Sequence, residues 1–306
     1  MATTTGSTDG PGGPPATAKA TPPRLLVDAL ERATALDVPA EKIAKAVRDA
    51  LSPGKVKNAL SGTWFGHAVH PPLTDVVIGA FTSASLLDLL GDRSWTAQER
   101  LIGVGIAAAV PTALTGASDW ADAEPADDGV RRVGLVHANL NTTALAVYAA
   151  SLAARRRGAY GRGAALALAG MAILTVSSYL GGHMSFTRGV GANQTAFDPG
   201  PREWTYAADS AELAVGEPKA AVAGDAPVLL VRHEHGVHAI HDRCSHRGCA
   251  LSDGDIDGHV VTCACHGSRY DLEDGTVMRG PATAGQPLFD AREADGRVEV
   301  RLARRN

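Results

Sequence analysis

The sequence has few aromatic residues and no stripe of basic residues. Aromatic side chains make up 5% of the 306 residues, the formal net charge is −4, and the one cluster of arginines is short. A surface that binds nucleic acid needs a patch of positive charge, often with aromatic residues beside it. We therefore expect no nucleic acid partner.

The N-terminal residues lack the features of an export signal. No charged segment followed by an apolar one is present, and no twin-arginine pair precedes the first hydrophobic run, so the sequence predicts no cleaved signal. Residues 1–23 are small, polar and rich in proline, a composition that cannot form a core. We expect a disordered tail there.

Cysteine is scarce, yet all four cysteines fall between residues 244 and 265. Cys244-x-His246 is followed by Cys263-x-x-His266, so each of two arms offers one thiolate and one imidazole. Two mixed pairs suit a two-iron, two-sulfide cluster in which one iron takes both cysteines and the other takes both histidines. The spacing therefore predicts a [2Fe–2S] cluster with these four ligands.

Two other metal sites fit the same residues less well. Structural zinc also accepts two cysteines and two histidines, but its usual pattern groups cysteine with cysteine. An all-cysteine plant-type cluster opens with a spacing like that of Cys244 and Cys249, but it then needs a third cysteine three positions on, and the next here is Cys263. Four buried cysteines without a metal would not alternate with histidines in this way.

Around these ligands the chain resembles Rieske iron–sulfur domains, from Trp204 to Leu302. The motifs C-x-H-x-x-C and C-x-C-H-G-S are similar to those of the Rieske subunits of cytochrome bc-type complexes. That resemblance implies a disulfide between Cys249 and Cys265 that joins the two cluster-bearing loops. It also implies that the two ligand histidines lie at an exposed tip, where their iron faces a partner.

The resemblance extends to residues that surround the cluster. Ser268 and Tyr270 match the family positions whose hydroxyls donate to a bridging sulfide and to a ligand thiolate, and Gly280 and Pro281 belong to a loop that resembles the one covering the cluster. Donors aimed at sulfur favour the reduced cluster, which carries one more negative charge, so both hydroxyls should raise the reduction potential. Ordinary strand capping and packing is the alternative role for Ser268 and Tyr270.

From Trp204 onward, short segments alternate apolar and polar residues between Gly-containing turns, which predicts an antiparallel β domain. Five further histidines lie in these strands and turns. We interpret them as polar faces, with a second metal site as the alternative; they are His233, His235, His238, His241 and His259.

Strongly apolar runs are also missing, yet four segments approach the roughly 20 residues needed to cross a bilayer. They are Pro72–Leu90, Leu101–Ser118, Val133–Ala154 and Ala164–Gly182, and polar residues such as Asp75 and Asn139 interrupt them. A soluble four-helix bundle is the alternative, but its helices should carry charged stripes, and Ala164–Gly182 has no charge. Small residues on every face favour close packing of membrane helices.

The motifs GHAVHPPLTDVVIGA, TALTGASDW, VHANLN and YLGGHMSFTRGVG in this region are similar to those of an uncharacterised bacterial four-helix membrane-domain family that also occurs fused to Rieske domains. The sequence thus predicts an α + β protein of two domains, with an N-terminal four-helix transmembrane bundle and a C-terminal antiparallel all-β Rieske domain. The expected parts are a tail (1–23), an amphipathic helical segment interrupted at Pro39 (24–58), a four-span membrane domain (59–183), a linker (184–203) and the Rieske domain (204–306).

Histidines of the membrane domain gather at the ends of three predicted spans. Because the spans alternate in direction, all of them should lie at the membrane face that carries the Rieske domain. Ionisable groups at membrane depth often mark a functional site. This predicts a site for b-type haem, a metal or a quinone head group, formed by His67, His70, His137 and His183.

The charges around the spans give conflicting signals about the membrane face. Arg155, Arg156, Arg157 and Arg162 would keep the loop between the last two spans in the cytoplasm, which places the Rieske domain outside. Lysines and arginines before the first span, and the absence of a signal on a long tail, oppose this. A disulfide favours an oxidising compartment, although a bridge shielded beside a cluster can persist inside. On balance we expect a multi-pass cell-membrane protein with the Rieske domain on the cytoplasmic face.

These features predict a membrane-anchored carrier that moves one electron at a time in a chain linked to quinol or cytochrome, with a redox partner protein or quinol as its partner. The protein would be an electron carrier or an oxidoreductase subunit rather than a self-contained catalyst. No second iron domain follows the cluster, so the chain is not itself an oxygenase. The alternatives are a ferredoxin-like donor to a separate oxygenase and a redox sensor without turnover.

Overall fold

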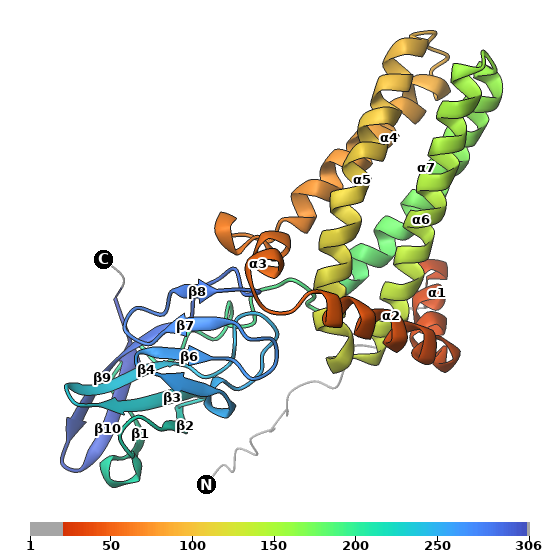
Figure 1. The fold of residues 1–306 in the computed structure, drawn as a ribbon. Helices are drawn as coiled ribbons and strands as arrows, with labels where there is room; N and C mark the ends of the chain where they lie inside the picture. The colour runs from red at the N-terminus through yellow and green to blue at the C-terminus, as the bar shows by residue number, and fades with distance from the viewer. Residues whose placement is uncertain (1–20, 305–306) are drawn as a thin grey trace, which may run out of the picture.

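The computed structural model describes residues 21–304, which form a helical part and a β part (Figure 1). The helices build an elongated bundle, and the β part lies at one end of it. Most of the predicted tail, residues 1–20, lies outside the described residues. Its last residues are already helical, because α1 (Pro22–Glu31) begins with two prolines whose fixed φ suits a first helical turn.

Three short helices lie at the bundle end that faces the β domain: α1, α2 (Asp37–Ala50) and α3 (Lys55–Ser61). Pro39 does not interrupt the segment as the sequence suggested. It falls in the first turn of α2, where the missing N–H would have no intrahelical partner anyway. The predicted amphipathic segment is therefore a set of separate helices packed on the bundle.

Four long helices correspond in place to the four predicted spans: α4 (His70–Leu89), α5 (Trp95–Ala123), α6 (Asp128–Arg156) and α7 (Tyr160–Gly182). By length and composition three helices of the described part could cross a membrane, namely His70–Leu89, Trp95–Ala126 and Tyr160–Thr187. Helix α6 does not reach that apolar composition, since its middle turns carry polar residues such as His137, Asn139 and Asn141. The structure thus supports a membrane domain with three apolar helices, and the count of four spans stays a prediction.

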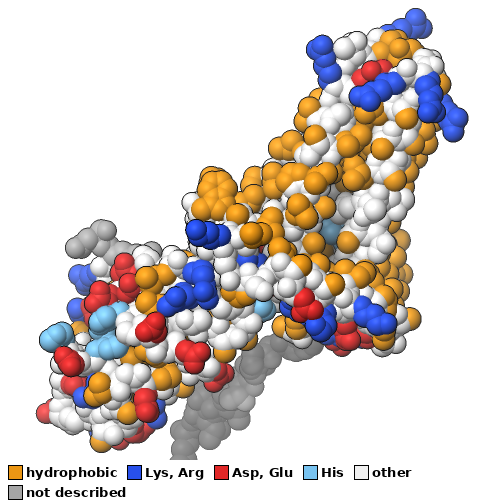
Figure 2. Space-filling model, viewed as in Figure 1, with side chains coloured by type: hydrophobic (Ala, Val, Ile, Leu, Met, Phe, Trp, Pro, Cys, Tyr) orange, Lys and Arg blue, Asp and Glu red, His pale blue; other side chains and the backbone are white. Residues whose placement is uncertain are grey.

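The surface of the bundle fits a lipid environment along its length. Figure 2 shows hydrophobic side chains over most of the visible bundle, with lysines and arginines mainly at its two ends. Exposed apolar side chains of α4, α5 and α7 contribute to this surface, among them Leu86, Val110, Leu114 and Val176. A soluble monomer rarely exposes so large an apolar patch.

Inside the bundle, two helical hairpins meet through a pair of stacked aromatic rings. Phe81 of the α4–α5 hairpin stacks on Tyr148 of the α6–α7 hairpin, with ring centroids 3.9 Å apart and planes 4° from parallel. A glycine lies under each ring: a Cβ on Gly105 would be 2.4 Å from Phe81, and one on Gly170 would be 2.8 Å from Tyr148. The two glycines therefore let the hairpins pack closely around the rings.

The β domain is antiparallel, as predicted, and consists of two sheets. The first has the order β1-β10-β9-β4-β3-β2, and the second has the order β5-β6-β7-β8. The strands of the first sheet are β1 (Thr205–Asp209), β2 (Pro218–Ala223), β3 (Ala226–His233), β4 (Gly236–His241), β9 (Leu288–Ala294) and β10 (Arg297–Leu302). Those of the second are β5 (Asp255–Asp257), β6 (Val260–Thr262), β7 (Arg269–Asp271) and β8 (Val277–Arg279).

Strand β3 is buried on both faces, which explains its unbroken apolar run. Val228 and Leu230 belong to the core under the first sheet, whereas Leu229 and Val231 belong to a second core between the sheets. Alternate residues of a strand point to opposite faces, so one strand can serve both cores. The second core also contains Cys244 and Cys263, and it supports the loops that carry the predicted ligands.

Candidate cluster site and its contact with the helical domain

The predicted ligands lie on two loops that share the same backbone geometry. In the loop after β4, the N–H of Cys244 donates to the carbonyl of Cys249 at 2.8 Å, and the N–H of Gly248 donates to the carbonyl of Cys244 at 2.8 Å. In the loop after β6, Cys263 donates to Ser268 at 2.8 Å, and Gly267 donates to Cys263 at 3.0 Å. Gly248 and Gly267 have φ of 80° and 73°, a left-handed conformation that glycine adopts without strain.

The two loops bring all four predicted ligands together. Cys244 and Cys263 are each 2% exposed, and their thiols lie within hydrogen-bonding reach of one another. The rings of His246 and His266 lie 5.1 Å apart and nearly perpendicular. The cysteines thus lie in the core of the domain and the histidines lie toward its surface, which gives two separate pairs of metal-binding atoms.

The electrostatic environment suits metal ligation. Burial holds the pKa of His246 well below that of an ordinary imidazole, and burial also lowers the pKa of His266, so both rings are neutral at neutral pH. Among the described residues, Nδ1 of His246 is buried without a hydrogen-bond partner. The hydrogen bond from Cys244 lowers the pKa of Cys263, which favours one thiolate in the pair. Neutral imidazoles and a thiolate are the forms that bind iron.

The disulfide implied by the resemblance is present. Cys249 and Cys265 are bonded to each other across the two loops, with their Cα atoms 6.5 Å apart. Cys249 lies five residues after the ligand Cys244, and Cys265 lies two residues after the ligand Cys263. The bond therefore couples the two arms of the site directly. It should keep both pairs of ligands in register when the loops fluctuate.

Hydroxyl groups approach the ligand thiols from the β-domain side. The hydroxyl of Tyr270 lies 3.1 Å from Sγ of Cys244 and 3.0 Å from Oγ of Ser245. Oγ of Ser268 accepts from the N–H of Ala282 at 3.0 Å, which leaves its own proton available for another acceptor. Ser245 was missed by the sequence analysis, because a serine between a ligand cysteine and a ligand histidine carries no signal of its own.

Replacing Tyr270 with phenylalanine should lower the reduction potential by about 40 mV while the cluster stays assembled. An iron-bound thiolate can only accept a hydrogen bond, and loss of a donor that is stronger in the reduced state costs about 1 kcal/mol. The measurement is a redox titration followed by paramagnetic resonance. Tyr206→Phe is the matched control, since that hydroxyl bonds to Asp209 on β1. Equal potentials in the two variants would reduce Tyr270 to a packing role.

The predicted covering loop at Gly280 and Pro281 is itself covered by the helical domain. Oγ1 of Thr63, just after α3, donates to the carbonyl of Ala282 at 3.1 Å. A Cβ on Gly280 would lie 1.9 Å from the same Oγ1, so only glycine permits this approach. Pro53 makes a similar close approach to Gly267, at 3.1 Å from its ideal Cβ position.

The ligand histidines are therefore not at a free tip, contrary to the expectation from the sequence. Nε2 of His246 lies 3.6 Å from a carboxylate oxygen of Asp122, at the end of α5, and His266 lies next to the backbone of the same residue. Asp122 forms an ion pair of 2.7 Å with Lys57 of α3, and both side chains are 5% exposed. Lys57 also donates to the carbonyl and hydroxyl of Ser118, at 3.1 and 2.9 Å.

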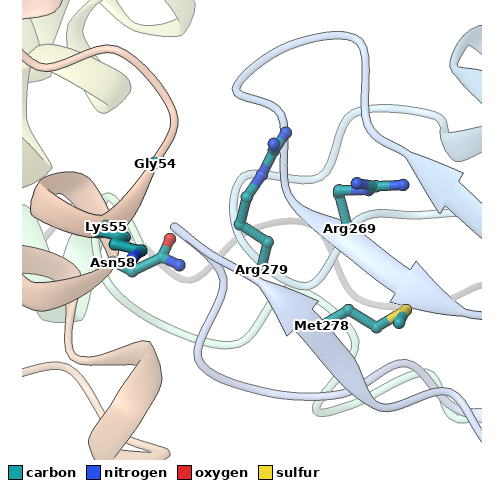
Figure 3. Close-up of a pocket in the computed structure, with 6 residues that line it drawn as sticks. All are labelled: Gly54, Lys55, Asn58, Arg269, Met278 and Arg279. Carbon is teal, nitrogen blue, oxygen red and sulfur yellow. The ribbon is translucent and has the colours of Figure 1, made fainter.

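A cavity of about 370 Å³ marks the edge of this contact. Figure 3 shows Lys55 and Asn58 of the α3 segment on one side and Arg269, Met278 and Arg279 of β7 and β8 on the other. Arg279 donates to the carbonyl of Gly267 at 2.9 Å, beside the predicted ligand His266. The seam between the domains thus runs directly past the second ligand loop.

The four histidines of the predicted membrane site do not form one group. His67 is exposed and its ring bonds to the carbonyl of its neighbour Ala68, whereas His183 pairs with Glu31 of α1 at 2.8 Å. His70 and His137 lie on different hairpins of the bundle, where their rings pack against Gly116 and Gly181. These two of the four thus share a similar setting.

His70 and His137 occupy equivalent places in the two hairpins. Each lies eleven residues before the stacked aromatic ring of its own hairpin. Nδ1 of His70 donates to the carbonyl of Thr112 at 3.1 Å, and Nδ1 of His137 donates to that of Ser177 at 2.8 Å. Because a carbonyl can only accept, each neutral ring has its lone pair on Nε2. Nε2 of His137 faces the amide nitrogen of Asn141 at 3.0 Å.

Comparison with known proteins identifies both parts of the chain. Residues 203–290 match the Rieske [2Fe–2S] domain, and residues 66–194 match a family of predicted membrane proteins, DUF2231. The anthranilate 1,2-dioxygenase ferredoxin subunit of Burkholderia cepacia is 33% identical over 100 residues, which are 33% of this chain and 93% of that protein.

Other relatives come from a different class of complex. The cytochrome b6-f complex iron-sulfur subunit 3 of a Nostoc species is 42% identical over 65 residues, but these are 21% of this chain and 35% of that subunit. Among solved structures, the ferredoxin of carbazole 1,9a-dioxygenase from Nocardioides aromaticivorans is 24% identical, covers 33% of this chain and 98% of that one, and has a TM-score of 0.31. The Rieske domain binds a [2Fe–2S] cluster and carries electrons. With its cluster domain at residues 203–290 and a predicted membrane domain before it, the chain belongs to the Rieske [2Fe–2S] family.

Proposed function

We propose that the protein is a membrane-anchored Rieske carrier that exchanges single electrons with a quinol- or cytochrome-linked chain at the membrane. In this proposal Cys244 and Cys263 hold the inner iron, and His246 and His266 hold the outer iron. The bound cluster supplies one-electron redox chemistry. The chain itself holds the ligands in place through the Cys249–Cys265 bridge and directs the histidine side toward the helical domain.

The observation that carries this proposal is the contact between His246 and Asp122 at 3.6 Å. A carrier that delivers electrons to a soluble partner needs its outer ligands accessible, whereas here α3 and the end of α5 cover them. The nearest route for an electron into or out of the outer iron then leads through the membrane domain. Neutral imidazoles beside a carboxylate are also suited to take up a proton together with an electron.

A second candidate is an electron donor to a separate oxygenase, favoured by the 33% identity to a dioxygenase ferredoxin subunit. For that role the β domain would have to separate from α3 and α5 before it reached a soluble partner. The two candidates differ in redox potential, because quinol-linked Rieske centres lie toward the upper end of a range of about −150 to +300 mV. Oxygenase delivery suits the lower end.

The deciding experiment uses the full chain in detergent. A quinol is mixed with the oxidised protein and the cluster is followed by its absorbance, and the midpoint potential is measured in parallel. A high midpoint with reduction by quinol supports the membrane role. A midpoint near the lower limit, with reduction by a soluble reductase but not by quinol, would establish the ferredoxin role instead.

We propose that the Rieske domain faces the cytoplasm and that the helical domain crosses the membrane several times. Support comes from the last turn of α6, where one of the arginines that favoured the opposite orientation is not a free charge: Arg155 is fully buried and pairs with Asp88 and Gln98. Buried and paired, it contributes less to topology than an exposed arginine would. Protease cleavage at the exposed turn of Asp295 and Gly296, in inverted vesicles but not in intact cells, is the expected result.

We also propose that His70 and His137 form the membrane-domain site for haem or a quinone head group, since each presents an unprotonated Nε2 from an equivalent place. His70→Ala and His137→Ala should each remove a Soret band of the purified protein or, if none is present, slow reduction of the cluster by quinol at least tenfold. His67→Ala is the control, since that ring is exposed and bonds only to its neighbour. Unchanged spectra and rates in both variants would leave the bundle as an anchor.

A further inference from the structure

Three histidines outside the cluster gather on the surface of the β domain. They are His233 at the end of β3, His238 in β4 and His259 in the turn between β5 and β6. Figure 2 shows a group of histidine side chains on the visible face of this domain. A role as polar faces of strands, preferred from the sequence over a second metal site, does not explain why three separate segments place them together.

The geometry of the three rings is close to that of a metal site. One ring nitrogen of each residue lies within 4.8 Å of the other two. The ring centroids are 5.1 Å apart for His233 and His238, 4.6 Å for His233 and His259, and 5.1 Å for His238 and His259. His238 lies opposite Val231, two residues before His233, so both rings project from the same face of the sheet.

A carboxylate and an open cavity complete the arrangement. Oε1 of Glu273 lies 3.6 Å from Nδ1 of His259. A cavity of about 500 Å³ is lined by the three rings and Glu273, together with Val215, Glu234 and His235. Within the part of the chain that the structure describes, Nε2 of His233 is buried and has no hydrogen-bond partner. A buried nitrogen without a partner is uncommon, because it forgoes the bond it would make to water.

We propose that His233, His238 and His259 bind one divalent transition-metal ion, Zn²⁺ in the first instance, with Glu273 or water as the fourth ligand. Imidazole nitrogen suits zinc, and three histidines with one further position is a common tetrahedral arrangement for it. Zn–N bonds of about 2.1 Å place the ligand nitrogens roughly 3.4 Å apart. The observed nitrogens are within 4.8 Å, so rotation about the side-chain bonds closes the site.

Such an ion would join the two sheets of the β domain. His233 and His238 belong to the first sheet, whereas His259 belongs to the turn that leads into β6, and the loop after β6 carries Cys263 and His266. A bound ion would therefore restrain one arm of the cluster site from a distance, without sharing a ligand with it.

The test uses the full chain in detergent, without a polyhistidine tag and with the iron–sulfur cluster in place. After treatment with a mild chelator, Zn²⁺ is titrated by calorimetry, and zinc and iron are counted by elemental analysis. One zinc per chain in addition to two irons is expected. His238→Gln and His259→Gln should each weaken binding at least tenfold, and Zn²⁺ should raise the Tm of the wild type but not of these variants.

His235→Gln provides the matched control, because His235 lines the same cavity but is not one of the three clustered rings. It should bind Zn²⁺ as the wild type does. Equal weakening in all three variants, or wild-type binding in His238→Gln and His259→Gln, would overturn the proposal. Zinc binding that persists in His259→Gln would show an adventitious surface ion only. The paramagnetic resonance signal of the cluster should be the same in every variant, so loss of zinc and loss of the cluster can be told apart.

Discussion

Replacing His266 with cysteine should abolish the low average g value that marks a reduced two-iron cluster with histidine ligands. In the proposed site the outer iron takes both imidazoles, so a third thiolate changes its charge and its ligand field. Clusters with four cysteines have potentials near about −400 mV, far below the Rieske range. The variant keeps one histidine, so it should either lose the cluster or hold one whose potential falls part of the way toward that value.

The matched control is His235→Cys, which adds a thiol to an exposed turn without touching the loops. It should keep the Rieske signal, the potential and two irons per chain. His246→Cys should behave as His266→Cys does, because the two rings lie 5.1 Å apart in the same site. A native Rieske spectrum in either ligand variant, or zinc in place of iron in the wild type, would refute the ligand assignment.

Most of the cluster site could be predicted because its geometry is local. Each arm is one tight turn in which a cysteine, a glycine and a bridge cysteine or serine are spaced by backbone hydrogen bonds that repeat between the two loops. Motif spacing specifies such turns directly. The antiparallel sheets follow for a related reason, since alternation and Asp-Gly turns act over a few residues, as at Asp295 and Gly296 with φ of 52° and 76°.

The helical part shows where local patterns stop being informative. Apolar stretches located all four long helices, but they did not show that glycines under Phe81 and Tyr148 let two equivalent hairpins pack around a ring stack. The gathering of four histidines was inferred from helix direction alone. The direction of a helix places a side chain at one end of the bundle but does not decide which face of the helix carries it. His67 and His183 bond elsewhere, to Ala68 and Glu31, and so lie apart from His70 and His137.

The contact between the domains could not be predicted at all. Lys57 and Asp122 are 65 residues apart from one another and more than 100 residues from His246 in sequence, and neither belongs to a motif. In the sequence, Lys57 is one more basic residue near a span and Asp122 one more acidic residue at a helix end. Only the folded arrangement shows that they meet beneath the ligand histidines.

This contact leads to the second large effect, because Asp122→Asn should raise the reduction potential of the cluster. An anion close to the outer ligand opposes the extra electron of the reduced state, so its removal favours reduction. At an effective dielectric constant of about 20, a unit charge just beyond an iron ligand contributes about 2 kcal/mol, or about 80 mV for one electron. The neighbouring Lys57 offsets part of this, and a rise of tens of millivolts is expected.

Stability should change in the same variant for a separate reason. Asparagine leaves the buried ammonium of Lys57 without its ion-pair partner, and breaking a buried pair costs about 3–5 kcal/mol. The double variant, in which Lys57→Met is added to Asp122→Asn, carries neither charge. It should restore much of the thermal stability and, because the opposing positive charge is also gone, return the potential toward the wild-type value.

Redox titrations and thermal melts of the full chain in detergent give both measurements, with Asp128→Asn as the control at an exposed carboxylate of α6. A rise of the potential in Asp122→Asn and its return toward the wild-type value in the double variant would show that the cluster senses the end of α5. The domains would then be in contact during the titration. If Asp122→Asn and Asp128→Asn leave the potential equally unchanged, the ligand histidines lie away from Asp122 in solution. The route through the membrane domain would then be wrong, and release of the β domain to a soluble partner would become the better account of its electron transfer.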